Sequence, residues 1–264
     1  MRVVLTQPQP RVAGLAINLS AARHEVATLS FQRIVERTGE PQVARQLRAL
    51  EHADWIIPVS PNAVEVLAGH LSSRTTTLTA QVALIGPGSL ERWQHSIATG
   101  LWLGQAPQPL LPRSGTYDAA ALIAEPQLQS VSGKRIAIIQ AAERRASWAD
   151  ELLKRGAKVT VIAAYSVESI VPTSDEALQL IAWLGDSRKA DSPIMLASSV
   201  AIADVCSSWL RHSLPMNWQH AMEQCLWLVN HPKIEEFLKR AAWARVKTIM
   251  PGERGLLEAL ESLA

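Results

Sequence analysis

The sequence has few of the residues that characterise disulfide-bonded and metal-binding proteins. It contains two cysteines among 264 residues, which cannot form a disulfide framework or, alone, a zinc site. Cys206 and Cys225 sit among apolar residues, so we expect buried free thiols. The seven histidines show neither HxxxH nor HExxH spacing, so we predict no metal site.

Excess charge and long hydrophobic runs are also scarce. The net charge is +2 and the basic residues are scattered, so we predict no nucleic-acid partner. The longest apolar runs, such as VTVIAAY, are much shorter than a membrane span. Met1 leads into the strand-like VVLT without a basic and apolar leader, so we expect a cytoplasmic protein with no membrane partner.

Motifs for nucleotide binding and nucleophilic catalysis are missing. The stretch GPGSLERW differs from GxGxxG, and the sequence contains neither GxxxxGK[ST] nor GxSxG. No pair of carboxylates follows the predicted strands, so glycosidase chemistry has little support. An enzyme with this sequence would work without a metal, a nicotinamide or a protein nucleophile, and we expect no cofactor.

What is present is a regular alternation of apolar strands and helical segments. Hydrophobic residues make up 48% and charged residues 19%, the balance of a globular protein with a full core. Unbroken apolar strands separated by helices indicate parallel sheets covered on both faces. The predicted strands are residues 3–6, 25–29, 55–60, 81–86, 101–104, 135–140, 158–165, 193–198, 225–229 and 246–250.

The two halves of this pattern repeat one another. VVLTQ matches IAIIQ, WIIPVSPNAV matches PIMLASSVAI, and LPRSGTYDAAAL matches MPGERGLLEAL. The alignment places Ser60 opposite Ser198 and Phe31 opposite Tyr165. We predict an α/β fold of two flavodoxin-like, doubly wound parallel-sheet domains that arose by internal duplication.

Small polar residues follow the strands of both predicted sheets. Ligands of such sheets bind beyond the carboxyl ends of the strands, where helix N-termini offer N–H groups to anions. Any one of these residues could instead be an ordinary helix cap. The candidate binding residues are Thr6, Ser60, Asn62, Gly86, Gly88, Ser89, Ser198 and Ser199.

Tyr165 is one of only two tyrosines and ends a predicted strand. Its ring could pack at the strand end with the hydroxyl in solvent. Alternatively, the hydroxyl could lie at a junction between domains and donate a proton to a leaving group. On the second interpretation Tyr165 is the candidate catalytic residue.

In order and spacing, these segments resemble the uroporphyrinogen-III synthase family over nearly the whole chain. The resemblance runs through VVLTQPQP, HEVATLSFQRIVE, DWIIPVSPNAVEVL, VALIGPGSLERW, SGKRIAIIQAAERRASWADELLKRGAKVTVIAAYSVE and GERGLLEALESL. The residues that match the family pattern are Ser60, Gly86, Ser89, Ser198 and Tyr165. The sequence departs from that pattern at Gln7, at residues 140–145 and at residues 230–232.

The resemblance implies that the two halves exchange parts. Residues 1–30 and 171–264 would form one discontinuous domain, and residues 37–163 would form the other. The segments 31–36 and 164–170 would pair as a two-stranded connector between them.

The resemblance also implies a cofactor-free lyase of tetrapyrrole biosynthesis. Its substrate would be hydroxymethylbilane, a linear tetrapyrrole polycarboxylate, which it would cyclise with loss of water and inversion of the terminal pyrrole ring. Tyr165 would protonate or hydrogen-bond the departing hydroxyl group. We expect a monomer, and a transient contact with hydroxymethylbilane synthase is a further partner that the resemblance suggests.

Two other functions stay open at this point. The departures from the family pattern are compatible with a degenerate homologue or a non-catalytic two-domain protein that binds small molecules. A nucleotide-binding enzyme of flavodoxin-like fold is the second alternative, and the missing phosphate motifs argue against it.

Overall fold

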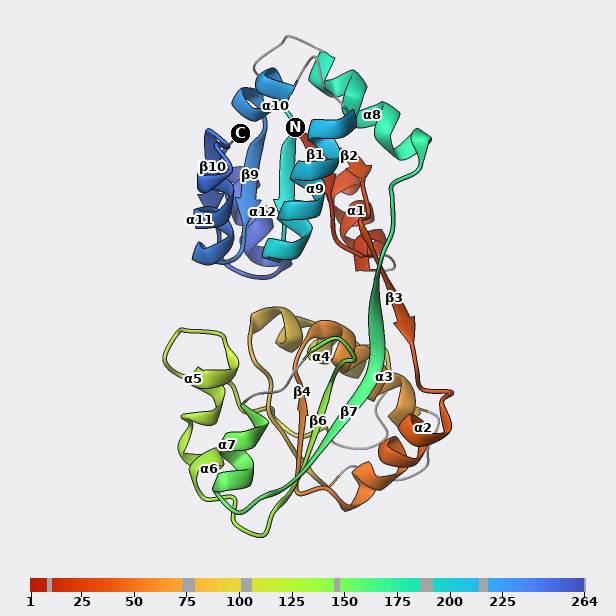
Figure 1. The fold of residues 1–264 in the computed structure, drawn as a ribbon, viewed down its shortest axis with the longest axis vertical. Coiled ribbons are helices and arrows are strands. Elements are labelled where there is room, and N and C mark those ends of the chain that lie inside the picture. Colours follow the sequence, from red (N-terminus) through yellow and green to blue (C-terminus); the bar gives the residue numbers. More distant parts are fainter. Residues whose placement is uncertain are drawn as a thin grey trace. The chain divides into compact units, whose positions relative to one another are not determined.

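The strands form two five-stranded sheets in two compact units of the chain (Figure 1). A computed structural model describes residues 1–8, 11–72, 79–100, 106–144, 148–185, 192–213 and 218–263. Unit 1 comprises Met1–Arg33 and Glu168–Ala264, and unit 2 comprises Ile34–Val167. The chain is thus mixed α/β. The strand predicted at 101–104 lies outside the described residues.

The sheet of unit 1 is parallel and has the strand order β10-β9-β8-β1-β2. In its centre, Val4 pairs with Ala27 on one side and with Met195 on the other. The strands are β1 (Arg2–Leu5), β2 (Glu25–Thr28), β8 (Ile194–Ala197), β9 (Leu226–Val229) and β10 (Arg245–Thr248). Its helices are α1 (Arg11–Ala21), α8 (Ser174–Gly185), α9 (Val200–Ser213), α10 (Trp218–Gln224), α11 (Pro232–Arg240) and α12 (Glu253–Glu261).

The sheet of unit 2 has the order β3-β7-β6-β4-β5. Its strands are β3 (Gln32–Glu36), β4 (Trp55–Pro58), β5 (Gln81–Val82), β6 (Arg135–Ala141) and β7 (Lys158–Ser169). Its helices are α2 (Pro41–Arg48), the short 3-10 helix η1 (Ala49–His52), α3 (Pro61–Ser72), α4 (Pro87–Ala98), α5 (Ala119–Ile123), α6 (Pro126–Gln129) and α7 (Ala149–Lys154). Strand β5 is shorter than the predicted 81–86, and Ala83 continues it as a single bridge to Leu110.

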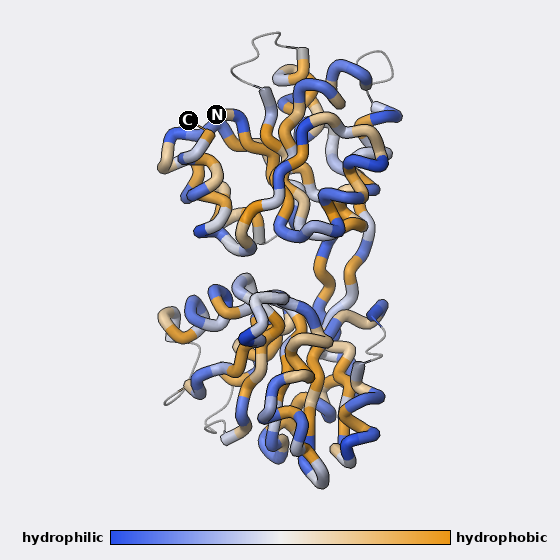
Figure 2. Tube along the Cα trace, turned by 90° about the vertical axis from the view of Figure 1, so that its left-hand side faces the viewer, coloured by the Kyte–Doolittle hydropathy of each residue, from blue (hydrophilic) through white to orange (hydrophobic). Residues whose placement is uncertain are grey.

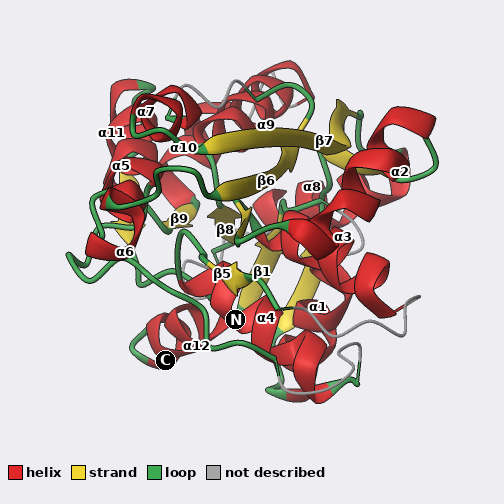
Figure 3. Ribbon diagram, turned by 90° about the horizontal axis from the view of Figure 1, so that it is seen from below, coloured by secondary structure: helices red, strands yellow, loops and turns green. Residues whose placement is uncertain are grey.

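Alternate residues of the central strands enter opposite layers of core, because successive side chains of a strand point to opposite faces. In unit 1, Val4 packs with α8, α9 and α11, whereas Val3 packs with α1 and α12. In unit 2, Ile56 packs with α2, α3 and α4, whereas Ile57 packs with α5, α6 and α7. The strands accordingly appear as hydrophobic stretches in Figure 2 and are flanked by helices in Figure 3. Both sheets are therefore covered on both faces, as the unbroken apolar strands predict.

Strand β7 extends beyond the apolar segment 158–165, because its polar end, residues 166–169, pairs with β3. Arg37 N donates to Ala164 O at 2.9 Å, and Ile170 N donates to Phe31 O at 3.0 Å. The two segments therefore run antiparallel. Each contains one of the two boundaries between the units, after Arg33 and after Val167.

Two helix ends show how local sequence sets the boundaries. Gly156 follows α7 with φ +83°, a conformation that favours glycine at the end of a helix. The start of α8 is capped by Thr173, the residue before the helix. The Thr173 hydroxyl accepts the Glu176 N–H at 3.4 Å, and the Glu176 carboxylate accepts the Thr173 N–H at 2.7 Å.

The prediction of buried free thiols is confirmed for Cys206 and Cys225, which are both fully buried. Among the helices that the structure describes, none is long and apolar enough to cross a membrane.

Candidate active site at the strand ends of unit 2

The corner between β4 and α3 is closed by Ser60. Pro61 suits the first helical position, where a backbone N–H has no partner in any case. The Ser60 hydroxyl accepts the N–H of Ala63 at 3.1 Å, so Ser60 is the N-cap of α3. Asn62 lies in the first turn of this helix and is half-buried.

Tyr165 reaches the same corner from β7. The pairing of β6 with β7 shifts register after Gln140, so that Ala141 lies opposite Tyr165, and Ala142 N donates to Tyr165 O at 2.8 Å. The Tyr165 side chain is 3% exposed, and its hydroxyl oxygen lies 2.7 Å from Ser60 Oγ. The hydroxyl therefore does not extend into solvent, and the structure joins two residues that the sequence separates widely.

The neighbouring corner, between β5 and α4, is built around Gly86. Gly86 precedes Pro87 at the start of α4, and no side chain caps this helix. Its carbonyl accepts the N–H of Ser89 at 3.1 Å, while Gly88 is half-buried and the Ser89 side chain is buried. A Cβ atom on Gly86 would lie 2.9 Å from Tyr117 Cβ, so the close approach of Tyr117 requires glycine here.

Three predicted site residues belong to unit 1. Thr6 is fully buried after β1, and its hydroxyl donates to the Leu196 carbonyl. Ser199 caps α9 by accepting the Ile202 N–H at 3.2 Å. Ser198 precedes it and is half-buried.

The cap geometry corrects the residue pairing inferred from the repeat. Ser60 and Ser199 each stand two residues after their strand and directly before their helix. The structural equivalent of Ser60 is therefore Ser199 and not Ser198. The sequence alignment shifted by one because both serines of the second corner fit its pattern.

Residues that depart from the family pattern form hydrogen bonds in or near their own loops. Gln140 is buried, and its side-chain amide donates to Arg144 O at 2.6 Å. His231 caps α11, with Nδ1 accepting the Lys233 N–H at 3.1 Å. The Gln7 carbonyl accepts the Ser30 hydroxyl at 3.0 Å. Arg145, which was included in the predicted loop, lies outside the described residues.

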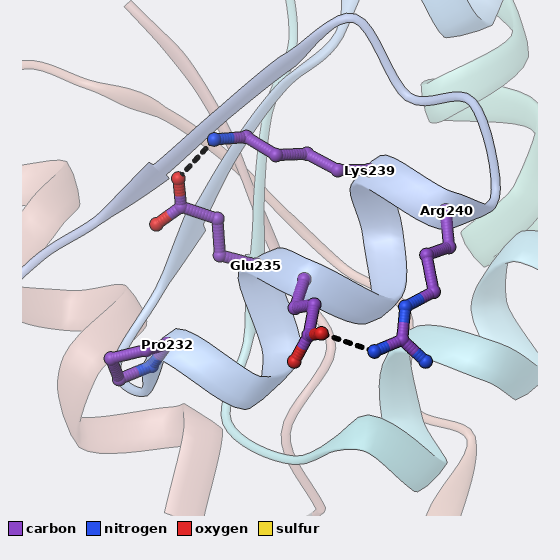
Figure 4. Close-up of a pocket in the computed structure, with 5 residues that line it drawn as sticks. Pro232, Glu235, Lys239 and Arg240 are labelled. Atoms are coloured by element: carbon purple, nitrogen blue, oxygen red, sulfur yellow. Dashed lines mark hydrogen bonds and ion pairs between the residues drawn. The ribbon is translucent and has the colours of Figure 1, made fainter.

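Neither of two hollows on the surface of the described residues is lined by a predicted site residue. One, of about 510 Å³, follows α11 and contains the Glu235–Lys239 and Glu236–Arg240 ion pairs (Figure 4). The other, of about 360 Å³, lies between α4 and residues 106–111 and is largely apolar. Within the described part of the chain, no three acidic, histidine or cysteine side chains gather in a way that could hold a metal ion.

Comparison with known proteins identifies the family. The family model for uroporphyrinogen-III synthase HemD matches residues 14–248, most of the chain. This chain belongs to the uroporphyrinogen-III synthase family.

Solved structures of uroporphyrinogen-III synthases share the fold. The Helicobacter pylori enzyme is 14% identical, with a TM-score of 0.54 and with 100% of each chain covered. A mutant of the Thermus thermophilus enzyme is 14% identical, with a TM-score of 0.53, covering 100% of this chain and 98% of that one. A search of curated protein sequences found no match. At this identity the structural likeness concerns the fold alone, and it agrees with the resemblance found in the sequence.

The residues predicted to form the site of this uroporphyrinogen-III synthase family member fall into two groups, one in each unit. In unit 2, the hydroxyls of Tyr165 and Ser60 are in contact. Ser60 follows β4, and Gly86, Gly88 and Ser89 follow β5, the strand beside β4 in the same sheet. Sequence reasoning missed the contact of Tyr117 with Gly86. No motif in the sequence indicated this contact, because the repeated segments do not include Gly86.

Proposed function

We propose that this chain is a lyase that converts hydroxymethylbilane into uroporphyrinogen III. Family membership places it in tetrapyrrole biosynthesis. The observation that carries the assignment of a reactive site is the 2.7 Å contact between the Tyr165 and Ser60 hydroxyls at the carboxyl end of a parallel sheet.

The reaction suits a site without a strong nucleophile. The pyrrole rings of the substrate supply the electrons that expel the terminal hydroxyl and close the macrocycle, with inversion of the last ring. The protein has to hold a flexible polyanion in one conformation and to assist the departure of the hydroxyl group. Tyr165 would supply the hydrogen bond or proton for that departure.

The substrate carboxylates would be bound by backbone N–H groups and hydroxyls at helix starts. This role is proposed for Thr6, Ser60, Asn62, Gly86, Gly88, Ser89, Ser198 and Ser199. Each hydrogen bond to a charged group contributes about 1.5–3 kcal/mol at best, so several corners must act together. For Thr6, whose side-chain hydroxyl already bonds to Leu196, the proposal concerns the backbone of the corner.

The finer description of the fold is part of the same proposal. We interpret the two sheets as duplicated flavodoxin-like domains, formed by residues 1–30 with 171–264 and by residues 37–163. The antiparallel pair of 31–36 with 164–170 would connect them. The strand orders support this, since β2-β1-β8-β9-β10 corresponds to β7-β6-β4-β5 followed by the Leu110 bridge. Three further points stay predictions: that the protein is a monomer, that it is cytoplasmic and that it contacts hydroxymethylbilane synthase transiently.

The test is to mix the protein with freshly made hydroxymethylbilane and to separate the type I and type III uroporphyrins after oxidation. The proposed function predicts type III product. Type I product alone, at the rate seen without protein, would contradict it and favour a degenerate homologue. A flavin or nucleotide spectrum in the purified protein would instead favour a nucleotide-binding enzyme.

A further inference from the structure

Ser60 has more hydrogen-bond partners than a helix cap needs. Its Oγ accepts the Ala63 N–H at 3.1 Å and lies 2.7 Å from the hydroxyl oxygen of Tyr165. A serine hydroxyl has two acceptor positions and one donor hydrogen. If Tyr165 donates its proton to Ser60, both acceptor positions are filled and the Ser60 hydrogen is left for another acceptor.

The exposure of the two side chains indicates which of them meets a substrate. Tyr165 is 3% exposed, with its ring packed among the core residues of unit 2. Ser60 is half-buried, so it is the member of the pair that borders solvent. A leaving group placed at this corner would therefore contact Ser60 first.

We infer that the proton for the departing hydroxyl passes from Tyr165 through Ser60, so that Ser60 is the residue touching the reacting oxygen. The inference rests on the proposed function and changes the role of Ser60 from binding carboxylate to transferring a proton. Tyr165 then acts through Ser60 as a proton source and positioning residue.

The bond between the terminal methylene carbon and its hydroxyl oxygen breaks, and the electron pair leaves with the oxygen while the pyrrole nitrogen supplies electrons to the carbon. The Ser60 hydrogen moves to that oxygen and forms water, and the Tyr165 proton moves to Ser60 Oγ. On ring closure the pyrrole carbon that loses its hydrogen returns a proton to Ser60 Oγ, and the Ser60 hydrogen passes back to the Tyr165 phenolate.

The start of α3 assists this transfer. As the Ser60 hydrogen leaves, negative charge develops on Oγ, which already accepts the Ala63 N–H. The positive end of the helix dipole stabilises charge of this sign, and consecutive hydrogen bonds polarise one another. One residue thus fixes the helix start and relays the proton.

The experiment is a double-mutant cycle on the single-turnover rate of type III formation, using Ser60→Ala, Tyr165→Phe and the double variant. We expect each single change to lower the rate at least about tenfold, and the double variant to be no slower than the slower single variant. Ser60→Thr, which retains the hydroxyl, should restore the rate to within a few-fold. A near-normal rate for Ser60→Ala, or losses that multiply in the double variant, would overturn the relay.

Two further measurements separate the relay from a structural effect. Thr173→Ala removes the cap of α8 and should lower stability without changing the rate. In mixtures of light and heavy water, two protons moving together give a curved dependence of the rate on deuterium content, whereas a straight line would count against the relay. If the unaltered protein forms no type III product, the proposed function fails first, and the relay fails with it.

Discussion

Equivalent corners of the two units share a backbone design and differ in one hydroxyl group. In each, a serine two residues beyond a buried strand caps the following helix: Ser60 in unit 2 and Ser199 in unit 1. The repeat aligns Tyr165 with Phe31 in unit 1. The Phe31 side chain is 1% exposed, and its ring packs edge-on against Trp209 with 5.8 Å between the ring centroids. Only the corner of unit 2 therefore pairs its serine with a phenol.

This difference separates what the fold needs from what the chemistry needs. Both serines satisfy a backbone donor that a helix start would otherwise leave unpaired. Both aromatic rings fill core, which Phe31 does without any polar atom. Unit 1 fills its core with the Phe31 ring and no hydroxyl, so packing does not explain the hydroxyl of Tyr165 in unit 2. This difference supports the proposed role of Tyr165 in the reaction.

The largest expected effect is on the reactivity of the thiols. Both cysteines lie in unit 1, so their labelling probes that unit. Burial raises the pKa of Cys225 to about 12 and also raises the pKa of Cys206. At pH 8 we expect a thiol reagent to label the native protein roughly a thousandfold more slowly than the unfolded chain, because both thiols are buried, carry little thiolate and meet the reagent only when unit 1 opens. Labelling followed over time would thus report the opening of unit 1 alone.

A matched probe of unit 2 completes that comparison. A variant with both cysteines replaced by alanine and Ala68→Cys carries one buried thiol in α3, where Ala68 is 1% exposed. Labelling rates that differ between the two proteins would indicate units that open separately. Equal rates over a range of denaturant concentrations would show instead that they open together.

The next effect is on the reaction. Tyr165→Phe makes the corner of unit 2 resemble that of unit 1, and it should slow type III formation at least about tenfold with folding intact. Tyr117→Phe is the matched control, since it removes the other tyrosine hydroxyl and keeps the ring carbons that approach Gly86. An unchanged rate for Tyr165→Phe, measured by isomer analysis of the product, would remove Tyr165 from the mechanism.

A smaller effect is expected from removing the cap in unit 1. Ser199→Ala leaves the Ile202 N–H without its partner and should cost about 1 kcal/mol of unfolding free energy, as should Ser60→Ala for Ala63. The two variants should differ in activity, with Ser60→Ala losing more. Equal losses of activity at equal losses of stability, measured by urea unfolding and initial rates, would contradict a special role for the corner of unit 2.

The smallest effect is on acid stability and compares one carboxylate in each unit. The hydrogen bond from Arg135 N lowers the pKa of Asp54 in unit 2, and the Lys239 and Thr248 side chains lower the pKa of Glu235 in unit 1. Groups with a lowered folded pKa stabilise the protein above their unfolded pKa, and this contribution is lost as the pH falls through the folded pKa. We therefore expect Asp54→Asn and Glu235→Gln each to weaken the protein at pH 7 and to flatten the loss of stability below about pH 4.

Urea unfolding midpoints between pH 3 and pH 7 test this prediction. The mutant and original curves should converge as the acid limit is approached, because the carboxylate is then protonated in both states. Curves that stay parallel over the whole range would show that these carboxylates do not titrate with folding.

The sequence revealed those parts of the molecule that depend on neighbours along the chain. The apolar pattern located most strands, and the small polar residues after them marked the corners where helices begin. Contacts across the chain could not be predicted in this way. The Thr6 hydroxyl meets Leu196 only because β1 lies beside β8, and Ser60 meets Tyr165 only because a register shift after Gln140 brings β7 to the corner. The apolar pattern did not extend to the polar end of β7, because the stability of that end comes from pairing with β3; only the family resemblance predicted this pairing.

The division of the chain between the two sheets has a consequence for synthesis on the ribosome. Unit 2 is one continuous segment, so all its strands have been synthesised once residue 169 has been translated. Strands β1 and β2 are made before any strand of unit 2, yet β1 acquires its second neighbour, β8, only after residue 194. The first-made strands therefore wait with an open edge while the middle of the chain folds, and this interval is when a chaperone would protect the nascent chain from mispairing.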